Sequence, residues 1–208
     1  MLQVPMLQAG APALVLASGS AARRALLEAA GLRFAVQPVA IDEAALRETV
    51  QAEGGGAEEA ALLLAGMKAA RGSAGAGDGL VIGADQILAC DGAWFGKPAD
   101  RYAAADQLRA LRGRTHSLAT AVACWRGGAE VWRHVASPRL SMRRFSDAFL
   151  DAYLAAEGAA VLGSVGCYRI EGLGVHLFDA VEGEHAAILG LPMLALLGFL
   201  RQHGVVVA

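Results

Sequence analysis

The chain has 208 residues, 55% of them hydrophobic, and a formal net charge of −2. This length is enough for one domain with a real hydrophobic core, and the small charge gives no electrostatic reason to bind nucleic acid. The longest apolar stretch, 186–200, contains Gly190 and Pro192 and is shorter than the roughly 18 residues that cross a bilayer. We therefore expect a soluble protein that binds neither nucleic acid nor a membrane.

Two features of the sequence favour a cytoplasmic location. No basic residue precedes Arg23, so the charged start of a secretory signal peptide is missing. Cys90, Cys124 and Cys167 are odd in number and far apart. That pattern suits reduced thiols better than a disulfide framework or a zinc site. We expect the protein in the cytoplasm.

Strands and helices are predicted to alternate in the first half of the chain. The short apolar run 13–17 is typical of a buried strand, and Ser18-Gly19-Ser20 leads from it into a helical pattern that ends before Gly31. A glycine loop at 54–56 lies between the predicted strand 34–41 and the predicted helix 57–71. The predicted elements are strand 13–17, the helix after Ser20, strand 34–41, helix 57–71 and strand 80–84.

Two hairpins are predicted in the second half. Asp91-Gly92 lies between the apolar runs 87–90 and 93–95, and both residues tolerate the positive φ of a tight turn. Gly127-Gly128 joins 117–125 to 129–140 in the same way. The other predicted elements are helix 100–112, helix 147–156, strand 175–178 and helix 192–203. This order of elements predicts the α/β class with a mixed sheet.

Asp85 interrupts an apolar run, GLVIGADQILACDG, at residues 79–92. An unpaired charge in a buried strand costs several kcal/mol. One interpretation is a structural carboxylate held in an ion pair, and the other is a carboxylate kept there for chemistry. The pattern alone leaves both open.

The segment LASGSAARR, residues 16–24, is a candidate anion site. A strand that breaks into a helix offers backbone N–H groups, the hydroxyls of Ser18 and Ser20 and the positive end of a helix dipole, with Arg23 one turn later. The alternative is that Ser20 is an ordinary helix cap. Likewise, Asp42 and Glu43 at a strand end are either functional carboxylates or the acids that begin a helix.

Lysine is rare in this chain. Of the 18 basic residues, Lys68 and Lys97 are the lysines, so these two positions favour a compact ammonium group. Lys97 lies in FGKPAD, after a hairpin and before a helix, where it either reaches inward or is a solvated loop residue. The five histidines are scattered, which favours structural roles over metal binding.

Taken together and in order, the motifs cover almost the whole chain and resemble the Maf family of nucleoside triphosphate pyrophosphatases. The segments that carry the resemblance are LASGSAARRALLEAAGLRF, VAIDEAAL, MKAA, VIGADQILACDGAWFGKPAD, LRALRGRTHSLATAVA, SVGCYRIEGLGVHLFDAVEG and ILGLPMLALLGFL. The resemblance implies an elongated, twisted mixed sheet flanked by helices with a central cleft, similar to that of inosine triphosphate pyrophosphatase. It also implies one domain over 1–208 with two lobes around that cleft, and a homodimer.

The resemblance also implies a reaction and a set of residues. Such proteins hydrolyse a nucleoside triphosphate between its α and β phosphates with a divalent cation, Mg²⁺ or Mn²⁺. The catalytic carboxylate falls on Asp85, and Glu43 joins it as a metal ligand. The positions that bind phosphate fall on Ser18, Ser20, Arg23, Lys68 and Lys97.

Three further positions bear on the base. The subtype that acts on 7-methyl-GTP carries Gln and Glu where this chain has Gln86 and Glu171, and a carboxylate there suits the positive charge of a 7-methylated guanine. The family commonly has Arg or Trp at Ala22, so a stacking side chain is missing and a broader specificity is expected. The alternatives are an enzyme that prefers dTTP or UTP, a phosphohydrolase that removes the γ phosphate, and a non-catalytic nucleotide-binding regulator of septum formation.

Overall fold

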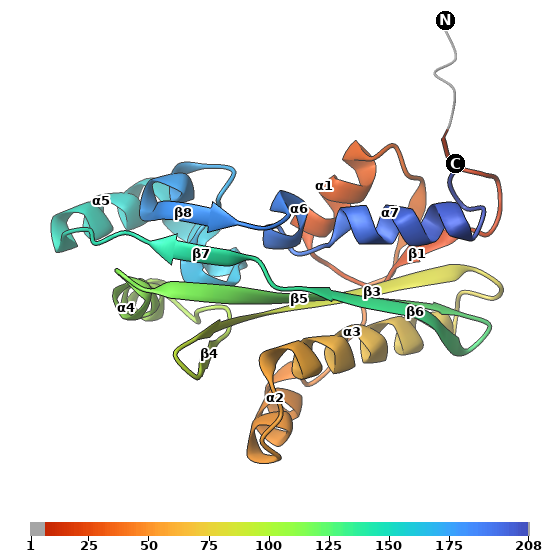
Figure 1. Cartoon of the computed structure of the whole chain (residues 1–208), viewed down its shortest axis with the longest axis horizontal. Helices are drawn as coiled ribbons and strands as arrows, with labels where there is room; N and C mark the ends of the chain where they lie inside the picture. The colour runs from red at the N-terminus through yellow and green to blue at the C-terminus, as the bar shows by residue number, and fades with distance from the viewer. Residues whose placement is uncertain (1–6, 208) are drawn as a thin grey trace, which may run out of the picture.

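The computed structural model of the chain describes residues 7–207, which form one elongated mixed sheet with helices on both faces (Figure 1). The strand order is β2-β1-β3-β5-β7-β8, with β4 paired to β3 and β6 paired to β5. The strands are β1 (Leu14–Leu16), β2 (Phe34–Val36), β3 (Leu80–Cys90), β4 (Ala93–Phe95), β5 (Thr115–Arg126), β6 (Ala129–Ala136), β7 (Arg139–Met142) and β8 (Phe178–Glu182).

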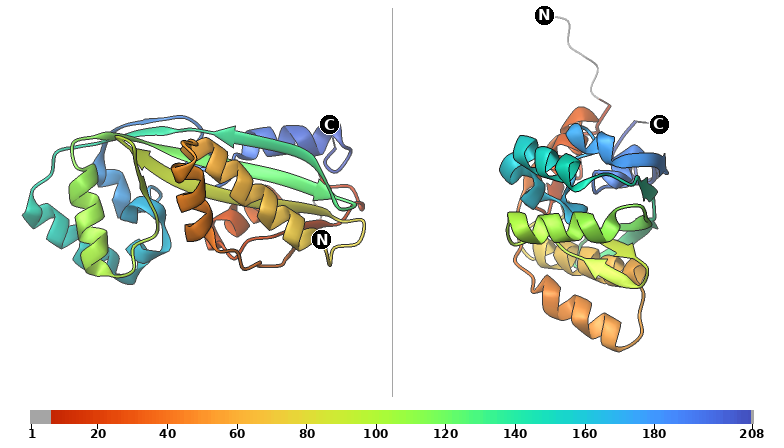
Figure 2. Two further views of the ribbon diagram at one scale, coloured as in Figure 1. Left: turned by 90° about the horizontal axis from the view of Figure 1, so that it is seen from below. Right: turned by 90° about the vertical axis from the view of Figure 1, so that its left-hand side faces the viewer.

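Helix α3 runs along one face of the sheet, with α2 next to it, and α1 and α7 lie on the other face (Figures 1 and 2). The helices are α1 (Ala21–Ala29), α2 (Glu43–Ala52), α3 (Ala57–Ser73), α4 (Arg101–Leu111), α5 (Asp147–Glu157), α6 (His185–Ile188) and α7 (Met193–Gln202). Three 3₁₀ segments follow α5: η1 (Gly158–Gly163), η2 (Val165–Cys167) and η3 (Leu173–Leu177). Within residues 7–207, no helix is both long and apolar enough to span a bilayer.

The long strands β3 and β5 form the centre of the sheet. They pair antiparallel from Val81↔Trp125 to Ala89↔Ser117, whereas β1 pairs parallel with both β2 and β3. Side chains on β5 alternate between the two faces, so Ala119, Ala121 and Ala123 pack under α3, whereas Val122 and Cys124 pack under α7. The predicted α/β class with a mixed, elongated sheet is confirmed.

Gly83 on β3 allows α3 to lie unusually close to the sheet. A Cβ atom added at Gly83 would lie 2.2 Å from the carbonyl oxygen of Ala65. Any other residue would therefore push α3 away. This close approach places Lys68 of α3 over Asp85, two residues further along β3.

Most predicted elements are confirmed, and the exceptions have local causes. Strand 34–41 ends at Val36, because the chain turns away and Asp42 caps α2, a helix the sequence reading did not assign. The hairpin strand predicted at 129–140 is divided into β6 and β7 at Ser137-Pro138. Proline has no N–H group to continue the hydrogen bonds between the strands. Strand 175–178 is wrong: those residues lie mostly in η3, and β8 begins at Phe178.

A buried histidine connects β5 to the segment after η2. His116 is 2% exposed, its Nε2 lies 2.8 Å from the hydroxyl of Tyr168, and its Nδ1 has no hydrogen-bond partner among residues 7–207. Burial lowers the pKa of His116 from 6.5 to about 4. The folded protein therefore holds this imidazole neutral at pH values where the unfolded chain protonates it.

Acidification should destabilise the fold through His116. Between pH 6.5 and 4 the unfolded state binds more protons than the folded state, so the free energy of unfolding falls as the pH falls. From pH 7.5 to pH 5 this group should contribute a loss on the order of 2 kcal/mol. Urea unfolding of wild type and His116→Gln at both pH values measures it. If the two proteins lose equal stability between these pH values, His116 does not have this role.

Candidate functional site

One cavity of about 810 Å³ gathers residues from parts of the chain that are far apart in sequence. Its walls come from the β1–α1 turn, α2, α3, β3, the β4–α4 loop and the segments around η1, η2 and α6. Every site residue predicted from the sequence lines it: Ser18, Ser20, Ala22, Arg23, Glu43, Lys68, Asp85, Gln86, Lys97 and Glu171. Residues up to 153 positions apart in sequence, from Ser18 to Glu171, therefore share one site.

Asp85 lines this cavity and is 3% exposed. Its Oδ1 accepts a hydrogen bond from Lys68 Nζ at 2.6 Å, and the same Nζ lies 2.6 Å from Glu43 Oε1. Lys68 is itself buried. Asp85 is thus held in an ion pair, as one of the two interpretations predicts. Because Asp85 and Lys68 also line a cavity, the ion pair does not exclude a chemical role for Asp85.

Arg47 completes this cluster and is absent from the sequence-based site. Its Nη2 lies 3.3 Å from Asp85 Oδ2 and 3.3 Å from Glu43 Oε2. Arg47 follows Glu43 by one helical turn, so recognition of α2 behind the Asp42 cap is the signal that finds it. We call Arg47, Asp85, Lys68 and Glu43 the charge ring, since each carboxylate binds one cation on either side.

The charge ring affects the ionisation of Glu43. Burial alone raises the pKa of this carboxyl group, but the hydrogen bond and charge of Lys68, together with the charges of Arg47 and Arg23, outweigh burial and lower it. Glu43 is therefore held ionised in the folded protein.

Arg23 is fixed by several hydrogen bonds at the start of α1. Its Nε donates to the carbonyl of Gly190 at 2.8 Å, and its Nη1 donates to Ala84 O at 2.8 Å and Ser18 Oγ at 3.2 Å. Burial lowers the pKa of Arg23, and the charges of Asp85 and Glu43 oppose that shift. Within the described residues, Nη2 has no hydrogen bond, which leaves it for an anion in the cavity.

The β1–α1 turn carries further groups of a kind that suits an anion. Ser20 caps α1, with its side chain accepting from Arg23 N at 3.4 Å, so the cap interpretation is confirmed. The same turn lines the cavity, and the N-terminus of α1 attracts negative charge. Lys97 is exposed in the β4–α4 loop and forms no ion pair with any residue of 7–207. The β1–α1 turn and Lys97 are therefore candidate groups for binding an anion in the cavity.

The cavity is also lined by Gln86, Tyr168, Arg169 and Glu171. Gln86 Nε2 donates to Thr120 Oγ1 and to carbonyl oxygens that include Ala187 O at 3.0 Å. This arrangement leaves its Oε1 as the acceptor available to a ligand. Arg169 is held by the buried Glu157 at 2.8 Å. Tyr168 and Arg169 are not among the site residues predicted from the sequence.

The two carboxylates fit a small hard cation. Among residues 7–207, no group of three or more His, Cys, Asp or Glu side chains is placed to hold a metal ion. Mg²⁺, however, is typically held by one or two carboxylates together with substrate phosphates and water. Glu43 and Asp85 supply that number of oxygen ligands beside the anion-binding groups.

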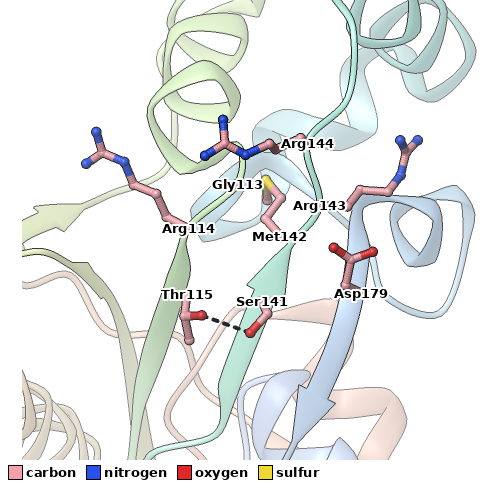
Figure 3. A pocket seen from close by; sticks show the side chains of 8 residues that line it. All are labelled: Gly113, Arg114, Thr115, Ser141, Met142, Arg143, Arg144 and Asp179. Carbon is pink, nitrogen blue, oxygen red and sulfur yellow. Dashed lines mark hydrogen bonds between the residues drawn. The ribbon is translucent and has the colours of Figure 1, made fainter.

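A second cavity of about 460 Å³ lies at the end of β5 and β7 (Figure 3). The guanidinium groups of Arg114, Arg143 and Arg144 point in different directions there. Arg114 pairs with Asp91 at 3.0 Å, and Arg143 lies over the ring of Phe149 at 4.2 Å. These side chains do not converge on a common point, so the first cavity is the candidate site.

Comparisons with known proteins agree with this site. The family model described as Maf, Maf-like protein, matches residues 13–203. A Granulibacter bethesdensis protein named nucleoside triphosphate pyrophosphatase is 53% identical over 190 residues, which cover 91% of this chain and 96% of that protein. A Rhizobium meliloti protein named 7-methyl-GTP pyrophosphatase is 45% identical over 195 residues, covering 94% of this chain and 98% of that protein.

Proposed function

The chain belongs to the Maf family, and from this premise we propose that it hydrolyses nucleoside triphosphates to the monophosphate and pyrophosphate. It is a nucleotide pyrophosphatase, a hydrolase of a phosphoanhydride bond. The observation that carries the proposal is the position of Asp85, bound by Lys68 in a cavity that also contains Arg23 and Lys97.

The charges in the cavity suit a triphosphate. Within the charge ring, two cations balance two carboxylates. Arg23 and Lys97 remain, beside the N-terminus of α1, to meet the roughly four negative charges of the substrate. Each charge-assisted hydrogen bond to a phosphate contributes about 1.5 to 3 kcal/mol.

In the proposed reaction, Asp85 accepts the proton of a water molecule. The water oxygen attacks the α phosphorus, and the bond from that phosphorus to the α–β bridging oxygen breaks. Pyrophosphate leaves with the bonding electrons. Lys68 and Arg23 line the same cavity, and we expect them to stabilise the charge that develops during this step.

Glu43 and Asp85 are proposed to hold Mg²⁺ or Mn²⁺. Such an ion supplies charge neutralisation of the phosphates during hydrolysis. Lys68 keeps both carboxylates oriented, since its Nζ lies 2.6 Å from one oxygen of each.

A product assay tests the proposed function. The purified protein should release pyrophosphate, and no orthophosphate, from a nucleoside triphosphate with Mg²⁺ or Mn²⁺. Orthophosphate as the first product would indicate removal of the γ phosphate. Nucleotide binding without any product would instead favour the non-catalytic regulator.

We propose 7-methyl-GTP as the preferred substrate. Gln86 and Glu171 both line the cavity, and we expect the Gln86 amide oxygen and the Glu171 carboxylate to accept hydrogen bonds from a guanine edge. Glu171 also complements the positive charge of the methylated ring. Ala22 leaves room beside the base, so weaker activity on other nucleotides is expected.

Glu171→Gln should reduce the preference for the methylated base. The change removes a charge but keeps a hydrogen-bonding group, so kcat/KM for 7-methyl-GTP should fall about tenfold, while that for dTTP changes little. The assay compares 7-methyl-GTP, GTP, dTTP, UTP and CTP, with Glu182→Gln on the exposed strand β8 as the control. If dTTP or UTP is the best substrate of the wild type, or if Glu171→Gln leaves the ranking unchanged, this specificity is wrong.

Other expectations remain predictions. They are a single domain over 1–208 with two lobes around the cleft, a homodimer and a cytoplasmic location. Size-exclusion chromatography with light scattering would measure the oligomeric state directly.

A further inference from the structure

The charge ring leaves no oxygen of its two carboxylates without a cation. Lys68 Nζ lies 2.6 Å from Asp85 Oδ1 and 2.6 Å from Glu43 Oε1. Arg47 Nη2 lies 3.3 Å from each of the remaining oxygens, Asp85 Oδ2 and Glu43 Oε2. A divalent cation that binds both carboxylates therefore competes with Lys68 or Arg47.

Arg47 is the cation that is easier to displace. Its two contacts at 3.3 Å are longer than those typical of charge-assisted hydrogen bonds, whereas both contacts of Lys68 are short. The side chain of Arg47 is 20% exposed and that of Lys68 is 9% exposed. Lys68 thus stays with the carboxylates when one of the two must leave.

The guanidinium of Arg47 has unused donors in the same cavity. Its Nε is buried and has no hydrogen-bond partner in the part of the chain that the structure describes. A Cβ atom added at Gly96 would lie 3.5 Å from its Nη1, so Arg47 lies next to the loop that carries Lys97. A planar guanidinium suits the oxygens of a phosphate group.

On the basis of the proposed function, we propose that Arg47 serves as an exchangeable counter-cation. In the free protein it holds Asp85 Oδ2 and Glu43 Oε2 in place. When a divalent cation binds these oxygens, Arg47 releases them and its guanidinium turns to the triphosphate. Arg47 thereby keeps two ionised carboxylates together until the substrate arrives.

Binding of Mn²⁺ alone to the nucleotide-free protein tests the first half of this proposal. Electron paramagnetic resonance of free Mn²⁺ gives the Kd, and Arg47→Met should lower it about tenfold, since one competing charge is removed. The control is Arg109→Met, another arginine paired with a carboxylate on its own helix, which does not line the cavity. An unchanged or higher Kd in Arg47→Met overturns the proposal. If Arg47→Met does not fold, Arg47→Gln carries the same expectation.

Steady-state kinetics tests the second half. At saturating Mn²⁺, Arg47→Met should raise the KM for the nucleotide about tenfold, because a charge-assisted contact to phosphate is lost, and kcat should fall less. Arg47→Lys should restore part of the affinity. An unchanged KM would overturn the role toward phosphate. If no variant releases pyrophosphate, the proposed function fails, and the Mn²⁺ titration still decides whether Arg47 competes with a cation.

Discussion

Asp85→Asn should reduce pyrophosphate release by about 10² to 10⁴-fold, because the amide is nearly isosteric but does not accept the proton of the attacking water. The change keeps an oxygen for Lys68 Nζ, which lies 2.6 Å from Oδ1 in the wild type. Lys68 and Arg47 also remain paired with Glu43. The variant should therefore fold, and the loss should appear in kcat.

The matched control for Asp85→Asn is Asp78→Asn. Asp78 also binds a guanidinium, with its Oδ2 2.7 Å from Arg126 Nη2, but it is exposed and does not line the cavity. Its activity should equal that of the wild type. Should Asp85→Asn retain more than about a tenth of the activity, Asp85 would not be the general base, and its ion pair with Lys68 would be structural.

The central part of the fold follows from the pattern of the sequence. The turn residues Asp91 and Gly92 predict the hairpin that joins β3 to β4, and the structure has it. The apolar runs predict strands at 80–84 and 117–125, which lie in β3 and β5, but not the long pairing of these two strands. Asp91 and Gly92 both have positive φ, at 49° and 83°. These elements are determined by local periodicity and turn chemistry, which a single sequence displays.

The elements that were missed depend on tertiary contacts. Strand β7 follows Pro138 and pairs with Thr115 to Ser117 of β5 and with β8, a choice of partners that local periodicity does not encode. The 3₁₀ segments after Glu157 contain Gly166 and Cys167, which both have positive φ. Apolar side chains of these segments, such as that of Val161, pack into the core that includes Leu118 and Leu140. Such irregular segments are fixed by packing, so their sequence resembles neither helix nor strand.

The candidate site divides in the same way. Each of the predicted residues lines the cavity. They could be predicted because the resemblance to a family identifies such residues one by one. The resemblance did not reveal how they bind one another. Arg47 was missed because α2 was not assigned, and the closure of the charge ring depends on the approach of α3 to β3 at Gly83. The ion pairs that form therefore depend on how the helices pack against the sheet.

Lys68→Met should lower both stability and activity. Removal of one partner from a buried ion pair costs about 3 to 5 kcal/mol, and here the two carboxylates of Glu43 and Asp85 would face each other with Arg47 as their remaining ring cation. Because Arg47 remains, the free energy of unfolding should fall by the lower end of that range. Activity should fall at least about 10²-fold, since two charge-assisted bonds are lost.

Lys97→Met separates the two effects, because the chain offers a second lysine in the same cavity without an ion pair in the described residues. Lys97 is exposed, so its replacement should change the free energy of unfolding by less than about 0.5 kcal/mol and still reduce pyrophosphate release. Urea unfolding of both variants, with activity assayed at a temperature where each is folded, measures both effects. Equal unfolding midpoints for Lys68→Met and Lys97→Met would mean that the charge ring does not stabilise the fold. Wild-type activity in Lys97→Met would instead make Lys97 a solvated loop residue and leave Arg23 and Lys68 as the cations that meet the phosphates.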